Sequence, residues 1–514
     1  MLGTQAEAAN YLWFKTTNDS DLTWAYSTSD SEPATGWSSN IGMSQFDATF
    51  KQKLADYQYS GGLNVRLVGD GIRTYTTVGI GNLAGGNYAI LNNYPLLDIR
   101  GKGIYTTILK LKDAAPVSTF FNYVIEPTGY IQRFRLANLT LNCNWNGQSS
   151  LWSSPTYSSG FKTGGLAVKC VYEGTVEYVK VTDFGSSSKC TQAEACNQSP
   201  PCQEVNAAGV EAFGIKVVTG NFDQPLYEPL ITVRNCEVTG FSRVKNGYCT
   251  GIVVETSDQE VTNIAAGCSG TLQVGQKRPV GCRTDGPNGT GNPVRMALVQ
   301  ANYVTYLFHG IAYGVASSEN VDFIGNTATY CKSAFNCDTR PAHRIKLLNN
   351  YYYNTYTGIN IGAWGTTAEF RDWTIQGNEI WLEGRYYNDY LCAAQRNLLA
   401  NKCMYPESDI PWEPSYCVRL AGGTGGPGPN DAIKVTSNTF SGHCCIGTSF
   451  SGPDGYRWFY FVWRPGTSAP GDPPQEACVN DPNPVISGNA VTANLQSLPG
   501  AGNVNVLSGR ITFP

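Results

Sequence analysis

The stretch of sequence that decides the fold is ALVQANYVTYLFHGIAYGVASSENVDFIGNTATYCKSAFNCDTRPAHRIKLLNN, residues 297–350. Short apolar runs in it end at Asn302, Asn326 and Asn350, so the same signal returns twice after 24 residues. Each asparagine is followed by two further strand-like runs before the next repeat begins. Three short strands per roughly 24 residues, with no helix between them, are typical of a parallel β-solenoid, in which stacked coils share one core.

The repeat continues on both sides of this stretch. Asparagine suits a tight bend because it tolerates left-handed backbone geometry, and stacked asparagines can hydrogen-bond along the solenoid axis. An ordinary sandwich of short strands is the alternative, but it gives no reason for a fixed period or for asparagine at one phase. The further copies of the apolar run are FRLAN (134–138), ITVRN (231–235), WTIQGN (373–378), IKVTSN (433–438) and VISGN (485–489).

A third run in each repeat predicts one further sheet. Its residues alternate between apolar and small or polar, as expected for strands with one buried face. The predicted strands are GLAVKC (165–170), GIKVVT (214–219), GIVVET (251–256), GIAYGV (310–315), AFNCDT (334–339), GINIGA (358–363), YCVRLA (416–421) and CCIGTS (444–449).

The sequence also predicts how the N-terminal end of the solenoid is covered. Residues 43–58, MSQFDATFKQKLADYQ, place Phe46, Phe50, Leu54 and Tyr57 on one helical face. A helix here is predicted to cap the open end of the first coil, which would otherwise expose its core and strand edges.

This helix is followed by a Gly-rich strand, GLNVRLVGDG (62–71), and by GKGIYTTIL (101–109). The order resembles the start of the pectate-lyase-like right-handed parallel β-helix superfamily, which includes pectin-active enzymes and phage tailspike depolymerases. The resemblance covers roughly residues 43–495 and implies an all-β, single-stranded right-handed parallel β-helix with long loops beside one sheet. The motifs that carry the resemblance are structural, so they indicate the fold and do not identify a reaction.

The two ends of the chain are predicted to differ from the body. Residues 1–42 alternate aromatic and polar positions and are interpreted as a β-rich arm or attachment segment, similar to N-terminal parts of phage tail proteins. The alternative is a flexible arm that packs Trp13, Trp24 and Trp37 onto the body. Residues 496–514 are interpreted as a C-terminal tail or cap.

The composition of the chain argues against several classes of binding partner. Charged residues make up 15% of the 514 residues and the net charge is −4, which argues against a partner nucleic acid. No run of roughly 18 apolar residues exists, so membrane insertion is not expected. Metal sites and cofactors are not predicted either, because the chain has no C-x-x-C and its three histidines lack ligand spacing.

The 17 cysteines point to two uses. Several are expected to be buried as small apolar side chains. The others fall in predicted loops and suggest disulfides and an extracellular location. The loop cysteines are Cys190, Cys196, Cys202, Cys249, Cys268, Cys282, Cys392 and Cys403.

Long insertions indicate where a ligand would bind. Counted from the repeated asparagine of each coil, these insertions lie on either side of the sheet formed by the third runs. There they would form the walls of a groove suited to a long polymer. The alternative is that insertions collect wherever the solenoid tolerates them. The insertions are residues 186–211, 258–292, 385–414 and 451–482.

Strand alternation places two acids on the groove floor. Glu255 and Asp338 lie two coils apart, about 10 Å at the strand spacing of about 4.8 Å, with Ala312 and Gly314 expected between them. Rotamers could bring the carboxyl groups to the separation of an inverting glycosidase, where one protonates the leaving oxygen and the other activates water. The competing interpretation is that both are solvated strand acids.

Other floor residues are predicted to hold the sugar. Asn336 and Asn360 would bind hydroxyl groups, and Arg340 or Arg419 would hold an acidic sugar. Trp364 lies just past its strand and joins them as a substrate-binding residue. Sugars also stack on aromatic rings, which gives YRWFYFVW (456–463) and Trp412 the same role, or else that of a satellite core under a loop.

The sequence therefore favours an extracellular or virion-surface protein that binds and cleaves polysaccharide, as a glycoside hydrolase or lyase. The resemblance implies a homotrimer. Its polygalacturonase-like members carry neighbouring Asp residues that this chain lacks, and Arg344-Ile345-Lys346 falls on a different sheet by the predicted phase. A non-catalytic structural or adhesion protein is the rival, and a groove between protomers is a third arrangement.

Overall fold

The computed structural model divides the chain into two compact units. Unit 1 comprises residues 1–186, 212–239 and 256–298, and unit 2 comprises residues 187–211, 240–255 and 299–514. No helix among the described residues is long and apolar enough to span a membrane. The structure describes residues 10–57, 60–80, 94–115, 121–126, 131–148, 150, 162–169, 171–186, 212–218, 230–240, 249–255, 296–307, 310–316, 318–337, 342–355, 357–361, 370–383, 415–420, 433–446, 459–463 and 485–497.

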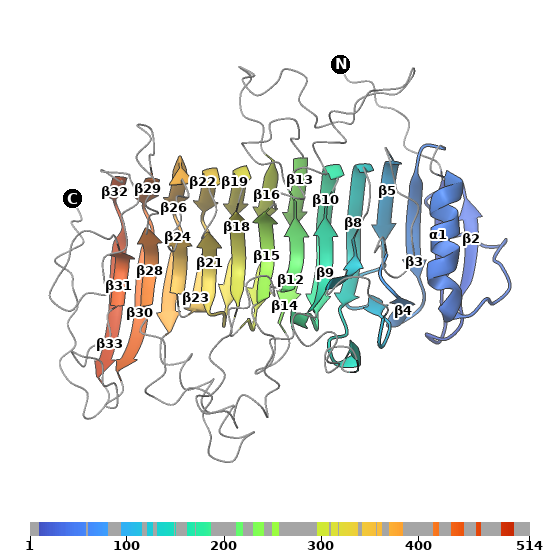
Figure 1. Cartoon of the computed structure of the whole chain (residues 1–514), viewed down its shortest axis with the longest axis horizontal. Coiled ribbons are helices and arrows are strands. Elements are labelled where there is room, and N and C mark those ends of the chain that lie inside the picture. The colour runs from blue at the N-terminus through green and yellow to red at the C-terminus, as the bar shows by residue number, and fades with distance from the viewer. Residues whose placement is uncertain are drawn as a thin grey trace, which may run out of the picture. The chain divides into compact units, whose positions relative to one another are not determined.

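Unit 1 is built of parallel strands that return to the same faces coil after coil (Figure 1). Strand β8 pairs along ten positions with β10, because both run through a corner of the coil without a break. Its strands are β3 (Leu63–Val68), β4 (Arg73–Thr77), β5 (Tyr94–Arg100), β6 (Thr107–Leu111), β7 (Phe121–Ile125), β8 (Ile131–Asn142), β9 (Lys162–Val168), β10 (Val171–Thr182), β11 (Gly185–Ser186), β12 (Ala212–Val217), β13 (Leu230–Arg234) and β14 (Glu237–Thr239), with a short 3-10 helix η2 (Asn146–Gln148).

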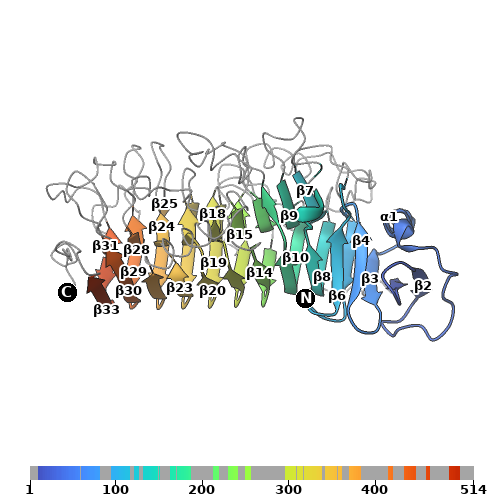
Figure 2. The ribbon, with the colours of Figure 1, turned by 90° about the horizontal axis from the view of Figure 1, so that it is seen from below.

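The predicted capping helix is confirmed. Helix α1 (Phe46–Tyr57), preceded by the 3-10 turn η1 (Met43–Gln45), lies beside the first strands of unit 1 (Figure 2). Phe46 and Phe50 are fully buried and pack on Phe14, with ring centroids 5.0 and 6.2 Å apart. Asp47 accepts hydrogen bonds from the Thr77 hydroxyl group and the Val78 amide, which fixes the helix to the first coil.

The N-terminal segment forms a hairpin that extends a sheet of unit 1. Strands β1 (Tyr11–Lys15) and β2 (Thr23–Ser27) pair antiparallel, and β1 also pairs in parallel with β3. Trp13 is 5% exposed and packs with Ala25 and Val68. The segment is therefore β-rich, as predicted, while its role as an attachment arm stays a prediction.

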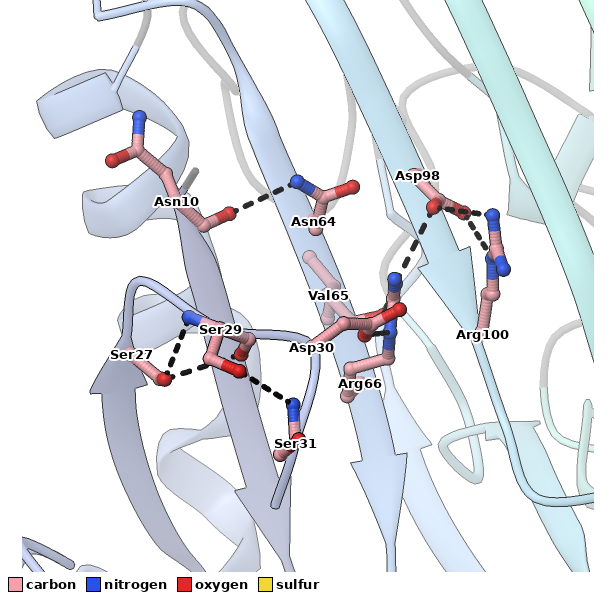
Figure 3. Close-up of polar contacts among 10 residues, drawn as sticks. All are labelled: Asn10, Ser27, Ser29, Asp30, Ser31, Asn64, Val65, Arg66, Asp98 and Arg100. Atoms are coloured by element: carbon pink, nitrogen blue, oxygen red, sulfur yellow. Dashed lines mark hydrogen bonds and ion pairs between the residues drawn. The ribbon is translucent and has the colours of Figure 1, made fainter. Parts of the chain in front are cut away.

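A buried ion-pair network holds the loop after β2 over this sheet (Figure 3). Arg66 on β3 is 7% exposed and bonds Asp30 at 2.6 Å and Asp98 at 3.4 Å. Asp98 is 1% exposed and also pairs with Arg100 at 2.9 Å. Arg66 is shared by two carboxylates and Asp98 by two guanidinium groups, so the network ties the loop after β2 to strands β3 and β5.

Unit 2 repeats a three-strand coil, and its strands pair in parallel with those of the next coil. The fold is therefore the predicted parallel β-helix. Its strands, with β16 at the unit boundary, are β15 (Cys249–Glu255), β16 (Ala297–Gln300), β17 (Tyr303–Thr305), β18 (Ile311–Ala316), β19 (Ser318–Ile324), β20 (Thr327–Thr329), β21 (Ser333–Cys337), β22 (Ala342–Leu348), β23 (Tyr351–Thr355), β24 (Thr357–Ile361), β25 (Phe370–Arg371), β26 (Trp373–Gln376), β27 (Glu379–Glu383), β28 (Ser415–Leu420), β29 (Ile433–Thr436), β30 (Thr439–Ile446), β31 (Phe459–Trp463), β32 (Val485–Ser487) and β33 (Ala490–Ser497).

A ladder of stacked asparagines forms one corner of unit 2. After Asn302, each side-chain oxygen accepts bonds from the main-chain and side-chain nitrogens of the preceding asparagine. The oxygen of Asn350, for example, accepts from the two nitrogens of Asn326 at 2.9 and 3.0 Å. Each side-chain nitrogen also donates to a carbonyl of the preceding coil, as Asn350 does to Phe323. The predicted stacking is confirmed for Asn302, Asn326, Asn350, Asn378, Asn438 and Asn489.

The predicted phase is wrong for the two copies in unit 1. Asn138 and Asn235 have φ of 59° and 53° and occupy the left-handed position that precedes the ladder. The register places Leu139, Val179 and Cys236 at the ladder position instead. In unit 2 the left-handed position is held by residues such as Gly325 and Asn349. Tolerance of left-handed geometry thus explains the asparagines before the ladder, and hydrogen bonding explains those within it.

The third-run prediction is correct for seven segments and wrong for the last. The segment 444–449 begins inside β30, which pairs with β27 and β33 in a different sheet. The strand that pairs with β28 is β31, which the sequence interpretation assigned to a flanking loop. The cause is the long insertion after Ile446, which breaks the even spacing on which the prediction relied.

The cysteine prediction holds in part. Cys249 lies in strand β15 rather than in a loop, so its assignment to the loop group is wrong. The other predicted loop cysteines lie outside the described residues. Within the described residues six cysteines are buried thiols, as expected for small apolar side chains: Cys143, Cys236, Cys249, Cys331, Cys337 and Cys417.

Candidate functional site

The predicted groove floor is the outer face of the sheet formed in unit 2 by β15, β18, β21, β24, β28 and β31, here called the floor sheet (Figure 2). The alternation is as predicted. Tyr313 and Phe335 point inward, where both contact Phe323. The register aligns the outward residues Val253, Gly314, Asn336 and Asn360 in one row across the strands, and the main chain of Arg419 continues this row.

Glu255 ends β15 and lies on the floor sheet with a half-buried side chain. Its neighbour on the next strand is Ala316, whereas Gly314 faces Val253. The expectation that Ala312 and Gly314 lie beside Glu255 is therefore wrong. Along β18, Gly314 lies one outward position and Ala312 two outward positions before the residue that faces Glu255. The residue beside Glu255 still has a small side chain, because Ala316 occupies the position that the sequence analysis gave to Ala312 or Gly314.

Asn336 and Asn360 form a side-chain amide pair across two coils. They are direct register partners, and the Asn360 side-chain nitrogen donates to the Asn336 side-chain oxygen at 2.5 Å. Both amides lie in the outward row of Val253, which is two residues along the strand from the row that Glu255 begins. Amides offer donors and acceptors together, which is the chemistry that recognises sugar hydroxyl groups.

The floor sheet is more covered than an open groove would be. Val253, Ala312 and Asn360 are 4%, 0% and 8% exposed. Glu255 and Asn336 are only half-buried. The accessible chemistry of the described floor is therefore concentrated at one carboxylate and one amide.

The remaining predicted site residues stay predictions. Asp338, Arg340 and Trp364 lie outside the described residues, as do Trp412 and most of the four flanking insertions. The main chain of Arg419 lies in β28 opposite Asn360, which agrees with its predicted row. Within the described residues no group of three His, Cys, Asp or Glu side chains could hold a metal ion.

The basic motif Arg344-Ile345-Lys346 lies on β22, in a different sheet from the floor, as the predicted phase required. Arg344 forms an ion pair with Glu319, and Lys346 lies 3.9 Å from Asp322. These cations therefore serve the packing of adjacent coils.

Sequence reasoning predicted the strands that follow the ladder asparagines, which form the sheet of β17, β20, β23 and β27, but gave their outer face no role. Its outward positions carry Tyr303, Tyr351 and Trp381, which are 41%, 43% and 43% exposed. The signal was present as alternation in YVT, TAT and YYY directly after the ladder asparagines.

No protein-family model and no curated protein match the chain. Among solved structures, a tailspike protein double mutant of E. coli bacteriophage HK620 in complex with pentasaccharide aligns with a TM-score of 0.37 and 9% identity, over 87% of this chain and 63% of that one. The Azotobacter vinelandii mannuronan C-5 epimerase AlgE4 A-module aligns with a TM-score of 0.29 and 11% identity, over 89% and 95%.

This chain is a parallel β-helix protein. It spans less than two thirds of the tailspike chain, and such low scores carry no argument about activity. The chemistry of this β-helix must be argued from its own residues.

Proposed function

We propose that this chain binds a polysaccharide across the floor sheet and hydrolyses its glycosidic bonds. The observation that carries the proposal is the in-register placement of the Asn336–Asn360 amide pair beside the row that begins at Glu255. Parallel stacking repeats polar groups at about 4.8 Å, so a polymer can make several modest contacts in succession.

In the proposed reaction Glu255 and Asp338 divide the acid and base roles. One carboxylic acid gives its proton to the glycosidic oxygen as the bond to the anomeric carbon breaks. The other carboxylate takes a proton from water, whose oxygen attacks the anomeric carbon from the opposite face. The products are two shorter chains, and the configuration at the cleaved carbon is inverted.

The amides are proposed to position the sugar ring. Asn336 and Asn360 would hydrogen-bond ring hydroxyl groups, and Arg340, Trp364 and Arg419 would extend the site on the same side. We further propose that the protein works outside the cell, on a virion surface, as a homotrimer. Sedimentation analysis tests the oligomeric state.

A second candidate function is non-catalytic adhesion to a glycan. The buried outward positions Val253, Ala312 and Asn360 favour it, because a covered floor leaves little room for a distorted sugar ring. The two candidates differ in turnover.

The test measures reducing ends and unsaturated products released from a panel of bacterial surface and plant polysaccharides. Glu255→Gln and Asp338→Asn are each expected to lower turnover by about a hundred-fold or more. The matched control is Glu173→Gln, an exposed strand acid of unit 1, which should leave turnover unchanged. Full turnover in both site variants would reject the assigned acids, unsaturated ends would indicate a lyase, and binding without turnover would favour adhesion.

A further inference from the structure

The outer face of β17, β20, β23 and β27 differs in chemistry from the floor sheet. We call its outward side chains the Tyr–Thr face (Figure 2 shows β20 and β23 side by side). All but the last strand contribute only uncharged hydroxyl-bearing residues to it. The face consists of Tyr303, Thr305, Thr327, Thr329, Tyr351, Tyr353, Glu379 and Trp381.

The ring of Tyr303 is anchored by a hydrogen bond to the neighbouring coil. Its register partner is Thr327, yet its hydroxyl group bonds Thr329 at 3.1 Å, one outward position further along β20. Thr329 in turn donates to the hydroxyl group of Thr305 at 2.9 Å. A ring tied down at its far end lies over the sheet and keeps one side toward solvent, which agrees with its 41% exposure.

Tyr353 is tied down in a similar way on the following coils. It hydrogen-bonds the carboxylate of Glu379, which is the register partner of Tyr351 on β27. Burial, with this carboxylate adding to it, raises the pKa of Tyr353 to about 12, so the hydroxyl group keeps its proton and donates it. The rings of Tyr351 and Tyr353 are within 16° of parallel, with centroids 6.4 Å apart.

The register spaces these rings along the coils. Tyr303 and Tyr351 lie in one row two coils apart, about 10 Å at the usual strand spacing. Trp381 is the register partner of Tyr353 on the next coil, about 5 Å further. Thr327 lies in the row between Tyr303 and Tyr351, so a hydroxyl group separates two aromatic rings.

We infer that the Tyr–Thr face is a second polysaccharide-binding surface, for a neutral glycan chain that runs across the strands. A pyranose ring has an apolar face of C–H groups and an edge of hydroxyl groups. Fixed aromatic rings match the first, and the intervening threonines match the second. Because Tyr303 and Tyr353 are already held by hydrogen bonds, these two side chains lose little entropy on binding.

The same chemistry disfavours a second copy of the chain as the occupant. The interface of a homodimer is more apolar than the rest of the protein surface. Here the Thr327 hydroxyl group lies between two rings, and it would need a partner when buried against protein. A sugar chain brings such hydroxyl partners at every residue.

The test is affinity electrophoresis of the full chain in gels containing dextran, galactomannan or arabinogalactan, with alginate as an acidic comparison. Tyr351→Ala and Trp381→Ala are each expected to weaken retardation by a neutral polysaccharide about three- to ten-fold. Tyr303→Phe, which removes only the anchoring hydroxyl group, should weaken it less. The matched control is Tyr105→Ala, an exposed tyrosine of unit 1, which should change nothing.

The outcomes separate this inference from the proposed function. Glu255→Gln with Asp338→Asn should keep full retardation, and loss of turnover without loss of retardation leaves the Tyr–Thr face intact. Absence of retardation by every neutral polysaccharide, or equal retardation of wild type and the face variants, would overturn the inference. So would a change in sedimentation coefficient in Tyr351→Ala or Trp381→Ala, because that would make the face a subunit contact.

Discussion

The two units build the same corner with different chemistry. In unit 2 each corner residue is an asparagine whose side chain bonds the coils before and after it. In unit 1 the equivalent residues are Leu139, Val179 and Cys236, which are 0%, 0% and 2% exposed. The preceding residue has left-handed geometry in both units, so the backbone bend does not require a ladder asparagine.

Cys236 shows how the two solutions are related. Its thiol lies 3.6 Å from the Val176 carbonyl oxygen, the same carbonyl position that the unit 2 asparagines bond. The Val179 amide bonds the sulfur, as the main chain of Asn302 bonds the side-chain oxygen of Asn326. A polar corner therefore needs one donor and one acceptor at this position, and even a weak thiol supplies both.

The second corner and the sheet before it differ as well. In unit 1 the left-handed residue is the acid Asp183, and β10 carries Lys180 paired with Glu237. In unit 2 the left-handed residues include Tyr306 and Tyr330, whose rings stack at 5.3 Å. One fold thus presents ion pairs in one unit and aromatic rings in the other, because outward side chains are not constrained by the core.

The largest effect is expected from breaking the polar corner with Asn350→Leu. Leucine fits the volume but makes none of the four side-chain hydrogen bonds of Asn350, which leaves buried donors and acceptors unpaired. The loss should be about 4 kcal/mol of unfolding free energy. Urea denaturation measures it, and native-state hydrogen exchange should locate it at β19, β22 and β23.

The control for this variant is Leu139→Met, a volume-conserving change at the apolar corner, which should cost less than about 1.5 kcal/mol. A loss of less than about 1 kcal/mol in Asn350→Leu would show that the ladder is not a source of stability.

An intermediate effect is expected at the second corner from Asp183→Asn. Burial raises the pKa of Asp183 to about 6, against the opposing charge of Lys110 and the Trp145 amide. The folded chain thus binds more protons than the unfolded chain between about pH 4 and 6, so stability falls as pH rises through that window. The variant should remove this fall and gain about 1–2 kcal/mol at pH 7, a figure reduced for partial exposure.

Urea denaturation of Asp183→Asn and wild type at pH 4 and pH 7 checks this. Asparagine also tolerates the left-handed φ of 56° at this position, so the substitution should add no backbone strain to the measured free energy of unfolding. Parallel pH dependence in the two proteins would contradict the assignment.

The smallest effect is expected from Cys236→Asn, which converts an apolar corner position into a ladder residue. The amide can donate to the Val176 carbonyl and accept from the Val179 amide, as the thiol does now. Thermal unfolding should move by no more than the equivalent of about 1 kcal/mol. A cost above about 2 kcal/mol would mean that the two corners are not interchangeable.

The sequence by itself determined the β-helix, the capping helix and the stacked asparagines. Period, apolar alternation and asparagine at a fixed phase are local signals, and a repeated unit places each copy in the same environment. The same reasoning placed Glu255, Asn336 and Asn360 on one outward face. It failed at Asn138 and Asn235, because a left-handed residue and a ladder residue can both be asparagine and are separated by one position.

Only the tertiary structure decided which strand follows a long insertion, which residue lies beside Glu255, and that Tyr303 bonds Thr329 on the next coil. Register between coils depends on the length of chain that loops out between strands, and the sequence does not mark how much of that length is used. Side-chain direction on an outer face is set by contacts with neighbouring coils, which pairing alone creates. Hence the repeat specified the scaffold, while the arrangement of its exposed chemistry required the coils to be stacked.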